Sequence, residues 1–154
     1  MEACKDVELL RDRLRRLKEP YIKTVIMFGS RAREESRGRS DVDLLVLHED
    51  CDVKDPVERR SHLYNLLREA LGEDFEDLTV IDMELKGFLK PREISALLLN
   101  VYWDALVVYD KTETVQGFLR RVREKIMKSG LNRVRDGRAY YWMLPKPMKE
   151  VKIL

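Results

Sequence analysis

Apolar residues recur along this chain with two spacings, and segments of the two kinds alternate. Steps of three and four residues predict amphipathic helices that bury one face. Such helices are predicted over residues 6–18, over Leu63–Leu71, from Pro91 to Val101 and from Val115 to Gly130. Pro91 suits a first helical turn, because the N–H group that proline lacks would be unpaired there. A further short helix is predicted over Arg31–Glu35, directly after a Gly-Ser turn.

Between these helices lie four shorter segments rich in β-branched and aliphatic residues, which predict strands. They are Tyr21–Phe28, Asp41–Leu47, Phe75–Met83 and Leu106–Tyr109. The second segment is apolar on both faces after its first residues, so we expect it inside the sheet. The order of elements predicts an α/β (α+β) fold, with a small mixed sheet of about four strands and flanking helices.

The chain has 154 residues, enough for one domain with a real core. We expect this domain over residues 1–128, with its centre over about 20–110, and a basic C-terminal extension over 129–154. From residue 120 onward there are eleven Lys and Arg against three acidic residues, so this end is strongly positive. No apolar run reaches the roughly 20 residues of a membrane span. The two cysteines indicate a reducing, cytoplasmic setting.

A glycine–serine turn and a pair of aspartates lie close together in the sequence. Gly29 and Ser30 follow the first predicted strand, and Asp41 and Asp43 open the second. Glycine lets a phosphate approach the backbone, and serine supplies a hydroxyl beside the N–H groups of a helix start. Side chains two residues apart on a strand share a face, so both carboxylates project together and would need a cation such as Mg²⁺. The segment therefore predicts binding of a nucleoside triphosphate with magnesium.

A third carboxylate would complete a two-metal site, in which one ion activates the attacking oxygen and the other holds the leaving phosphates. The third predicted strand offers Asp77 and Asp82. Asp77 lies near the start of this strand beside another acid, where water would surround it. Asp82 lies between apolar residues inside the strand, where an acid is harder to explain structurally. We therefore choose Asp82 as the third ligand.

Residues 29–46 resemble the Gly-Ser-x-Ala-Arg-Gly … Ser-Asp-x-Asp-Leu-x-Val signature of the minimal nucleotidyltransferases, a branch of the DNA polymerase beta superfamily. The resemblance extends over roughly residues 20–110. It implies that the triphosphate is bound by Gly29, Ser30, Arg33 and Ser40. It also implies that the catalytic residues Asp41, Asp43 and Asp82 hold two Mg²⁺ ions. One departure is Glu34, which stands where the family usually has glycine and adds negative charge near the triphosphate.

The resemblance further implies a reaction and a partner. The reaction is transfer of a nucleoside monophosphate, AMP from ATP, to an acceptor hydroxyl with release of pyrophosphate. Members of the family are often paired with a HEPN-type, ribonuclease-like toxin, so the chain would be an antitoxin that modifies a tyrosine of such a toxin. A toxin-binding module without catalysis is one alternative. A transferase for small molecules is another, although residues 110–154 are short for the acceptor domain that such enzymes carry.

The C-terminal extension interleaves basic residues with Tyr140, Tyr141 and Trp142. Positive charge combined with stacking aromatic rings is typical of surfaces that bind nucleic acid. An ordered strand, or a contact between two copies of the chain in a homo-oligomer, explains the same residues, and we favour that interpretation.

Overall fold

A computed structural model describes residues 2–33, 41–75, 77–137, 139–145 and 151–154 of the protein. At its centre is a four-stranded mixed sheet with the strand order β3-β2-β1-β4. The strands are β1 (Ile22–Phe28), β2 (Val42–His48), β3 (Leu78–Glu84) and β4 (Leu106–Asp110). β1 runs antiparallel to β2 and β4, whereas β2 and β3 are parallel. The expected mixed α/β fold is confirmed, and β2 lies inside the sheet as predicted.

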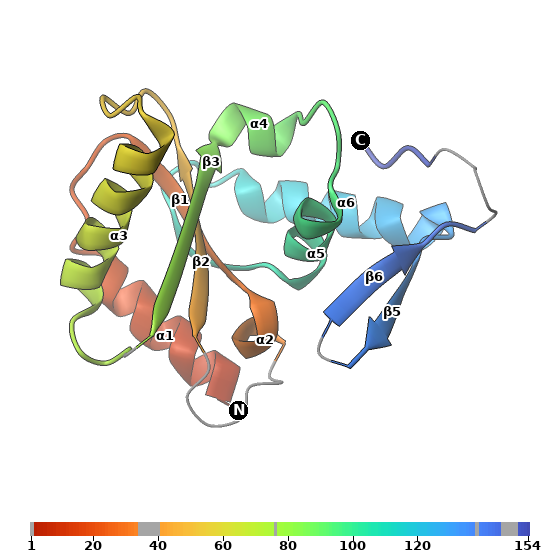
Figure 1. Ribbon diagram of the computed structural model, residues 1–154, viewed down its shortest axis with the longest axis horizontal. Coiled ribbons are helices and arrows are strands. Elements are labelled where there is room, and N and C mark those ends of the chain that lie inside the picture. The colour runs from red at the N-terminus through yellow and green to blue at the C-terminus, as the bar shows by residue number, and fades with distance from the viewer. Residues whose placement is uncertain (1, 34–40, 76, 138, 146–150) are drawn as a thin grey trace.

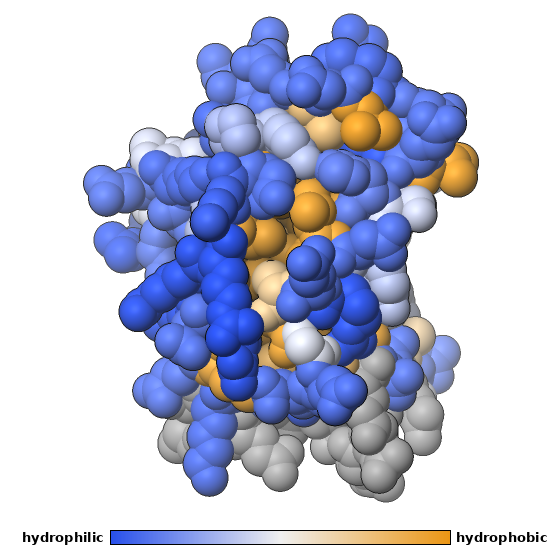
Figure 2. Space-filling view, turned by 90° about the vertical axis from the view of Figure 1, so that its left-hand side faces the viewer, coloured by the Kyte–Doolittle hydropathy of each residue, from blue (hydrophilic) through white to orange (hydrophobic). Residues whose placement is uncertain are grey.

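Helices cover both faces of this sheet (Figure 1). α1 (Glu2–Leu14) and α3 (Pro56–Leu71) pack on one face, and α4 (Leu85–Leu89), α5 (Ala96–Asp104) and α6 (Val115–Ser129) pack on the other. On the side of the molecule that carries α1 and α3, the surface is mainly hydrophilic and shows a narrow hydrophobic strip (Figure 2). The two helical layers thus enclose one apolar core on each face of the sheet.

β2 contributes to both of these cores. Leu44 and Val46 pack on the side of α1 and α3, and Leu45 and Leu47 pack on the side of α5 and α6. All four side chains are at most 2% exposed. A slip of one residue would exchange the two faces of the strand, so dense packing on both sides fixes its register. The polar residues at the start of β2 are therefore held in one place relative to β1 and β3.

Side-chain caps set the starts of two helices. Asp55 caps α3, with its carboxylate accepting a hydrogen bond from the Glu58 N–H at 2.9 Å. The Ser95 hydroxyl oxygen caps α5 by accepting from the Leu98 N–H at 3.0 Å. The prediction of a helix beginning at Pro91 is therefore wrong, because the Ser95 cap starts α5 at Ala96. α1 begins and ends four residues earlier than predicted, and α4 is too short to show a periodic pattern.

Beyond α6 the chain forms a separate antiparallel hairpin of β5 (Asn132–Asp136) and β6 (Ala139–Met143). One face of this hairpin carries Arg133, Arg135, Tyr140 and Trp142, which pair across the two strands. This face packs against α5, where the Trp142 indole N–H donates to Asn100 Oδ1 at 2.9 Å. The aromatic residues of the C-terminal segment thus lie in an ordered strand. Within the described part of the chain, no helix is long and apolar enough to cross a bilayer.

Candidate active site

The chain turns sharply where β1 ends and the short helix α2 (Gly29–Ala32) begins. Gly29 has a φ of +80°, a conformation that residues with a Cβ rarely adopt. The residue before it, Phe28, pairs with Asp43 of β2, so the turn lies beside the start of the neighbouring strand. A Cβ at Gly29 would collide with Asp43 Oδ2. The close approach of the turn to this carboxylate therefore depends on glycine.

Asp41 and Asp43 lie two residues apart where β2 begins, and they share one face of the sheet. Thr79 of β3 pairs with Asp43, and its hydroxyl donates a hydrogen bond to Asp41 Oδ2 at 3.1 Å. Burial raises the pKa of Asp43, and the charge of Asp41 raises it further, while the Thr79 hydroxyl and the charge of Arg33 act in the opposite direction. Two carboxylates thus repel each other in a partly buried place, and a bound cation would relieve this repulsion.

The chemistry of these side chains fits magnesium. Asp41, Asp43 and Thr79 offer hard oxygen ligands, and Mg²⁺ is usually held by one or two carboxylates together with water and substrate phosphates. Within the described ranges, no three His, Cys, Asp or Glu side chains come together in an arrangement that could hold a metal. The described residues therefore provide a pair of aspartates and a neighbouring hydroxyl group as ligands for one magnesium ion. Binding of the expected second ion stays a prediction.

Asp82 does not join this pair. Thr79 pairs with Asp43, and Asp82 follows Thr79 by three residues along β3. An odd step along a strand reverses the direction of the side chain, so Asp82 projects from the opposite face, toward α3. The structure thus does not bring Asp82 together with Asp41 and Asp43, and its role as a metal ligand stays a prediction. Asp77, the other acid considered, is exposed to solvent, and its backbone carbonyl oxygen accepts a hydrogen bond from the Val42 N–H at 3.0 Å.

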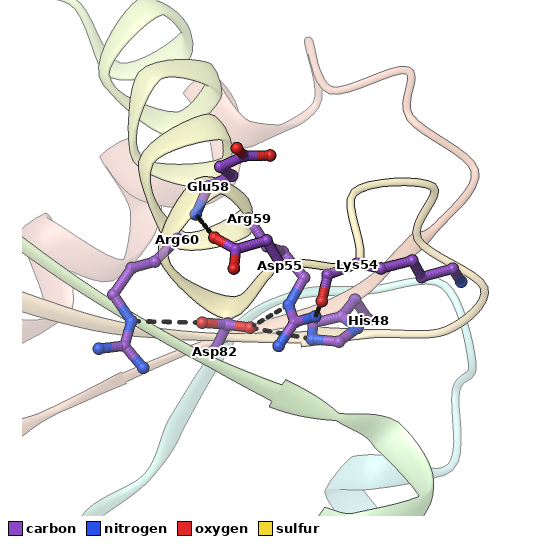
Figure 3. A network of polar contacts seen from close by, with 7 residues as sticks. All are labelled: His48, Lys54, Asp55, Glu58, Arg59, Arg60 and Asp82. Atoms are coloured by element: carbon purple, nitrogen blue, oxygen red, sulfur yellow. Dashed lines mark hydrogen bonds and ion pairs between the residues drawn. The ribbon is translucent and has the colours of Figure 1, made fainter.

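Asp82 is the centre of a network of ion pairs between β2, β3 and α3 (Figure 3). Its carboxylate, 2% exposed, accepts hydrogen bonds from Arg59 Nε at 2.8 Å and Arg60 Nε at 3.4 Å. His48 Nε2 lies 3.0 Å from the same carboxylate. Burial alone would raise the pKa of Asp82, but hydrogen bonds from Arg59 and His48 and the charge of Arg59 lower it below its usual value. These ion-pair partners give a structural reason for a buried acid in the middle of β3.

The two arginines after the Gly-Ser turn point in different directions. Arg31 turns back to α1, where its Nε donates to Asp6 Oδ2 at 2.9 Å. Arg33 turns toward the end of α5, where its Nη1 donates to Asp104 Oδ2 at 3.0 Å. The charge of Arg33 acts on Asp43, whose pKa it lowers. Arg33 is therefore the arginine whose charge reaches the aspartate pair.

A cavity of about 870 Å³ lies along β2 and β3 on the face of the sheet that carries Asp43. Leu45 and Ile81 line it, and they stand two residues beyond Asp43 and Thr79 on the same face of their strands. Leu97, Leu98 and Val101 of α5 add apolar surface. The charged residues of the lining are of both signs: Arg60, Lys86, Lys90 and Arg92 together with Asp82, Glu84 and Glu93. Gly29 lies beside the start of β2, whereas Leu45 lies further along this strand. The cavity therefore extends from the aspartates away from the Gly-Ser turn.

Some expected site residues lie outside the described ranges, and others were missed. Ser40 and Glu34 are outside those ranges, so the expected roles of both residues stay predictions. Thr79 could have been found as the polar residue on the face of β3 that the pair would share. Asp104 and Tyr140, which surround Arg33, are distant in sequence and carry no local signal.

The chain is similar to several known proteins. It is 39% identical over 62 residues to a Methanocaldococcus jannaschii protein provisionally named as a protein adenylyltransferase; the match covers 39% of this chain and 63% of that protein. The chain thus spans less than two thirds of the length of this curated relative.

Two solved structures overlap with most of the chain. A provisionally assigned nucleotidyltransferase from Sulfolobus solfataricus overlaps with 71% of this chain and 85% of its own, at 14% identity and a TM-score of 0.48. A chain from a toxin–antitoxin crystal structure with AMP-PNP overlaps with 84% of this chain and 90% of its own, at 21% identity and a TM-score of 0.45. The sequence identities and TM-scores of both matches are too low to assign a substrate or a partner to this chain.

The sequence model of the family described as "Polymerase beta, Nucleotidyltransferase" matches residues 14–99. The match covers more than half of the chain and includes β1, α2, β2, α3 and β3, the elements that hold Gly29, Asp41, Asp43 and Thr79. The chain belongs to the polymerase beta nucleotidyltransferase family.

Proposed function

We propose that this protein is a magnesium-dependent nucleotidyltransferase that transfers AMP from ATP to a hydroxyl group of another protein. The observation that carries the proposal is the packing of the Gly29 turn directly against Asp43, with Asp41 on the same face. A turn suited to bind phosphate thereby lies beside the two carboxylates. Family membership supports nucleotidyl transfer, and the provisional name of the Methanocaldococcus relative supports a protein as the acceptor.

The arrangement supports an in-line displacement. Phosphates beside Gly29 and Ser30 would put the leaving pyrophosphate on one side of the aspartate pair, and the cavity opens on the other side. The acceptor oxygen attacks the α-phosphorus from the cavity, and its proton is lost to solvent. The bond from the α-phosphorus to the bridging oxygen breaks, and pyrophosphate leaves with that electron pair. Asp41 and Asp43 would hold magnesium, which when bound neutralises charge on the phosphates.

The cavity favours an aromatic hydroxyl as the acceptor. Its lining by Leu45, Ile81 and Leu98 suits the ring of a tyrosine, whose hydroxyl would then point along the strands toward Asp43. The HEPN-type toxin as the carrier of the tyrosine, and hence the antitoxin role, rests on the resemblance of residues 29–46 to minimal nucleotidyltransferases.

The test is transfer of label from ATP carrying radioactive α-phosphate, in the presence of Mg²⁺ and the product of the neighbouring gene. We expect labelled partner protein and released pyrophosphate, both lost in the single variants Asp41→Asn and Asp43→Asn. Replacing the labelled tyrosine by phenylalanine should remove the label, whereas replacing another tyrosine should not. Label transfer that survives in both aspartate variants would contradict the proposal.

A toxin-binding module without catalysis is the second candidate, and the position of Asp82 is the observation that favours it. A two-metal reaction uses a third carboxylate near the pair, whereas Asp82 is committed to Arg59 and His48 on the other face. Under this alternative, the complex with the toxin would form with equal affinity in wild type and Asp43→Asn, and no label would transfer in either case.

A further inference from the structure

The second arginine of the Gly-Ser-Arg-Ala-Arg segment, Arg33, is held by parts of the chain that lie far away in sequence. Its guanidinium donates to Asp104 at the end of α5, and it lies over the ring of Tyr140 in β6, with the guanidinium carbon 4.7 Å from the ring centre. The side chain of Arg33 is only 16% exposed and that of Asp104 only 5%. The end of α2 and the hairpin are thus linked through the side chains of Arg33 and Tyr140. Figure 1 shows α2 and the hairpin on the same side of the molecule.

A second arginine occupies the same cluster. Arg133 Nη1 donates to the same Asp104 oxygen at 2.8 Å, and its guanidinium carbon lies 4.3 Å from the centre of the Tyr140 ring. One carboxylate therefore serves two guanidinium groups, and the aromatic ring faces both. Arg33, Asp104, Arg133 and Tyr140 thus form one cluster, in which both guanidinium groups share a carboxylate and an aromatic ring.

The hairpin is fixed to α5 on the side of this cluster. Trp142 donates to Asn100 at 2.9 Å, and its ring meets that of Trp103 in an edge-to-face arrangement with the ring centres 6.0 Å apart. Arg133 also donates to Asn100, at 3.4 Å. Tyr140 is therefore held in place by the neighbouring residues of its hairpin, and it can restrict Arg33 instead of merely following it.

We propose that the C-terminal hairpin is part of the nucleotide site, with Tyr140 as the positioning residue that holds Arg33 toward the triphosphate beside Asp43. The inference rests on the proposed function. A long arginine side chain loses rotational freedom when it binds a phosphate, and a side chain already held between Asp104 and Tyr140 has lost much of that freedom beforehand. Arg33 is joined to the Gly29 turn itself, because its backbone N–H donates to the Gly29 carbonyl oxygen at 3.1 Å.

Binding of a nonhydrolysable ATP analogue with Mg²⁺, measured by calorimetry, tests the role of Tyr140. Tyr140→Leu keeps apolar bulk and removes the aromatic ring, so we expect the Kd to rise about threefold to tenfold, the range of a partly buried cation–π contact. Tyr141→Leu is the matched control, because Tyr141 is the next residue, lies on the other face of the hairpin and is 46% exposed. Its Kd should stay within about twofold of wild type, as should that of Tyr140→Phe, which keeps the ring.

A double-mutant cycle separates positioning of Arg33 from general damage. In the Arg33→Ala background, Tyr140→Leu should cause no further loss of affinity, because the side chain that Tyr140 positions is absent. The same loss in both backgrounds would overturn the inference, as would equal effects of the Tyr140 and Tyr141 substitutions. Wild-type protein that binds no nucleotide would contradict the proposed function and this inference together. Wild-type binding with an ineffective Tyr140→Leu change would contradict the inference alone.

Discussion

Asp43 and Asp82 are both acids of the central sheet, and replacing each by asparagine should have opposite consequences. Asp82 is surrounded by Arg59, Arg60 and His48, which favour its charged form. For Asp43, burial and the neighbouring charge of Asp41 disfavour the charged form of the carboxyl group and raise its pKa. Asp82→Asn should therefore destabilise the protein while leaving the nucleotide site intact. Asp43→Asn should preserve or increase stability while removing nucleotidyl transfer.

The size of the Asp82 effect follows from its surroundings. Loss of one member of a buried ion pair costs about 3–5 kcal/mol. The side chains of Arg59 and Arg60 are 19% and 56% exposed, so water can solvate them after the change and reduce this cost. We expect the free energy of unfolding to fall by about 2–3 kcal/mol, which at this chain length lowers Tm by about 4–12 °C.

Thermal and urea unfolding followed by circular dichroism measures these changes, and the pH dependence gives a further check. A carboxyl group with a lowered pKa in the folded state stabilises the fold above its unfolded pKa of about 3.9. This stabilisation is lost as the pH falls through the lower, folded-state pKa. The difference in stability between wild type and Asp82→Asn should thus be constant from pH 7 to about 5 and shrink below about 4.

Two results would refute the reasoning. One is an Asp82→Asn variant as stable as wild type at pH 7, since the network would then contribute nothing. The other is a folded Asp82→Asn variant that has lost binding of Mg²⁺ and ATP, since this would return Asp82 to the metal site. A strongly destabilised Asp43→Asn variant would contradict the electrostatic account of the aspartate pair.

Three further substitutions test the turn, the cavity and the core. Gly29→Ala places a Cβ against Asp43 at a backbone conformation that favours glycine. Calorimetry should therefore show that a nonhydrolysable ATP analogue binds at least about tenfold more weakly. The control Gly72→Ala, at a positive φ with open space around it, should leave this affinity unchanged. Ile81→Trp should fill the cavity and abolish labelling of the protein acceptor, while the Kd for the ATP analogue stays close to wild type; equal loss of both would show that the cavity holds the nucleotide instead. Tyr102→Phe removes the buried hydroxyl that donates to the Phe88 carbonyl at 2.6 Å, so the free energy of unfolding in urea should fall by about 1–2 kcal/mol, and an unchanged value would contradict a net contribution from this bond.

The sequence allowed much of the sheet and the turn to be predicted, for physical reasons that are local. The apolar run of residues 44–47 signals a strand buried on both faces, and this strand is β2. Gly29 and Asp43 are close because β1 and β2 are neighbouring antiparallel strands that follow one another in the sequence. Adjacency of this kind needs only the strand pattern and the direction of the chain.

The missed features depend on register and on distant contacts. The face on which Asp82 lies depends on its pairing with Val46, and a shift of one residue in the register would have reversed the outcome. The start of α5 depends on a choice between Pro91 and the Ser95 cap, both of which are acceptable signals of a helix start. Arg33 contacts Asp104 and Tyr140, which are distant in sequence, and periodicity within a single segment carries no information about such contacts.

The pairing of β1 with β4 also has a consequence for how the chain folds. Thr24 of β1, fully buried, donates to Asp110 of β4, which lies 86 positions further along the chain, whereas β1 and β2 are consecutive strands in the sequence. Contacts over short loops form early, and contacts across long loops wait for the entropy of loop closure to be overcome. The Gly29 turn and the aspartates should therefore come together in the first folding events. The contacts of Arg33 with Asp104 and Tyr140 should form last. In a folding-rate experiment, substitutions around Arg33 should accordingly speed unfolding and leave the folding rate almost unchanged.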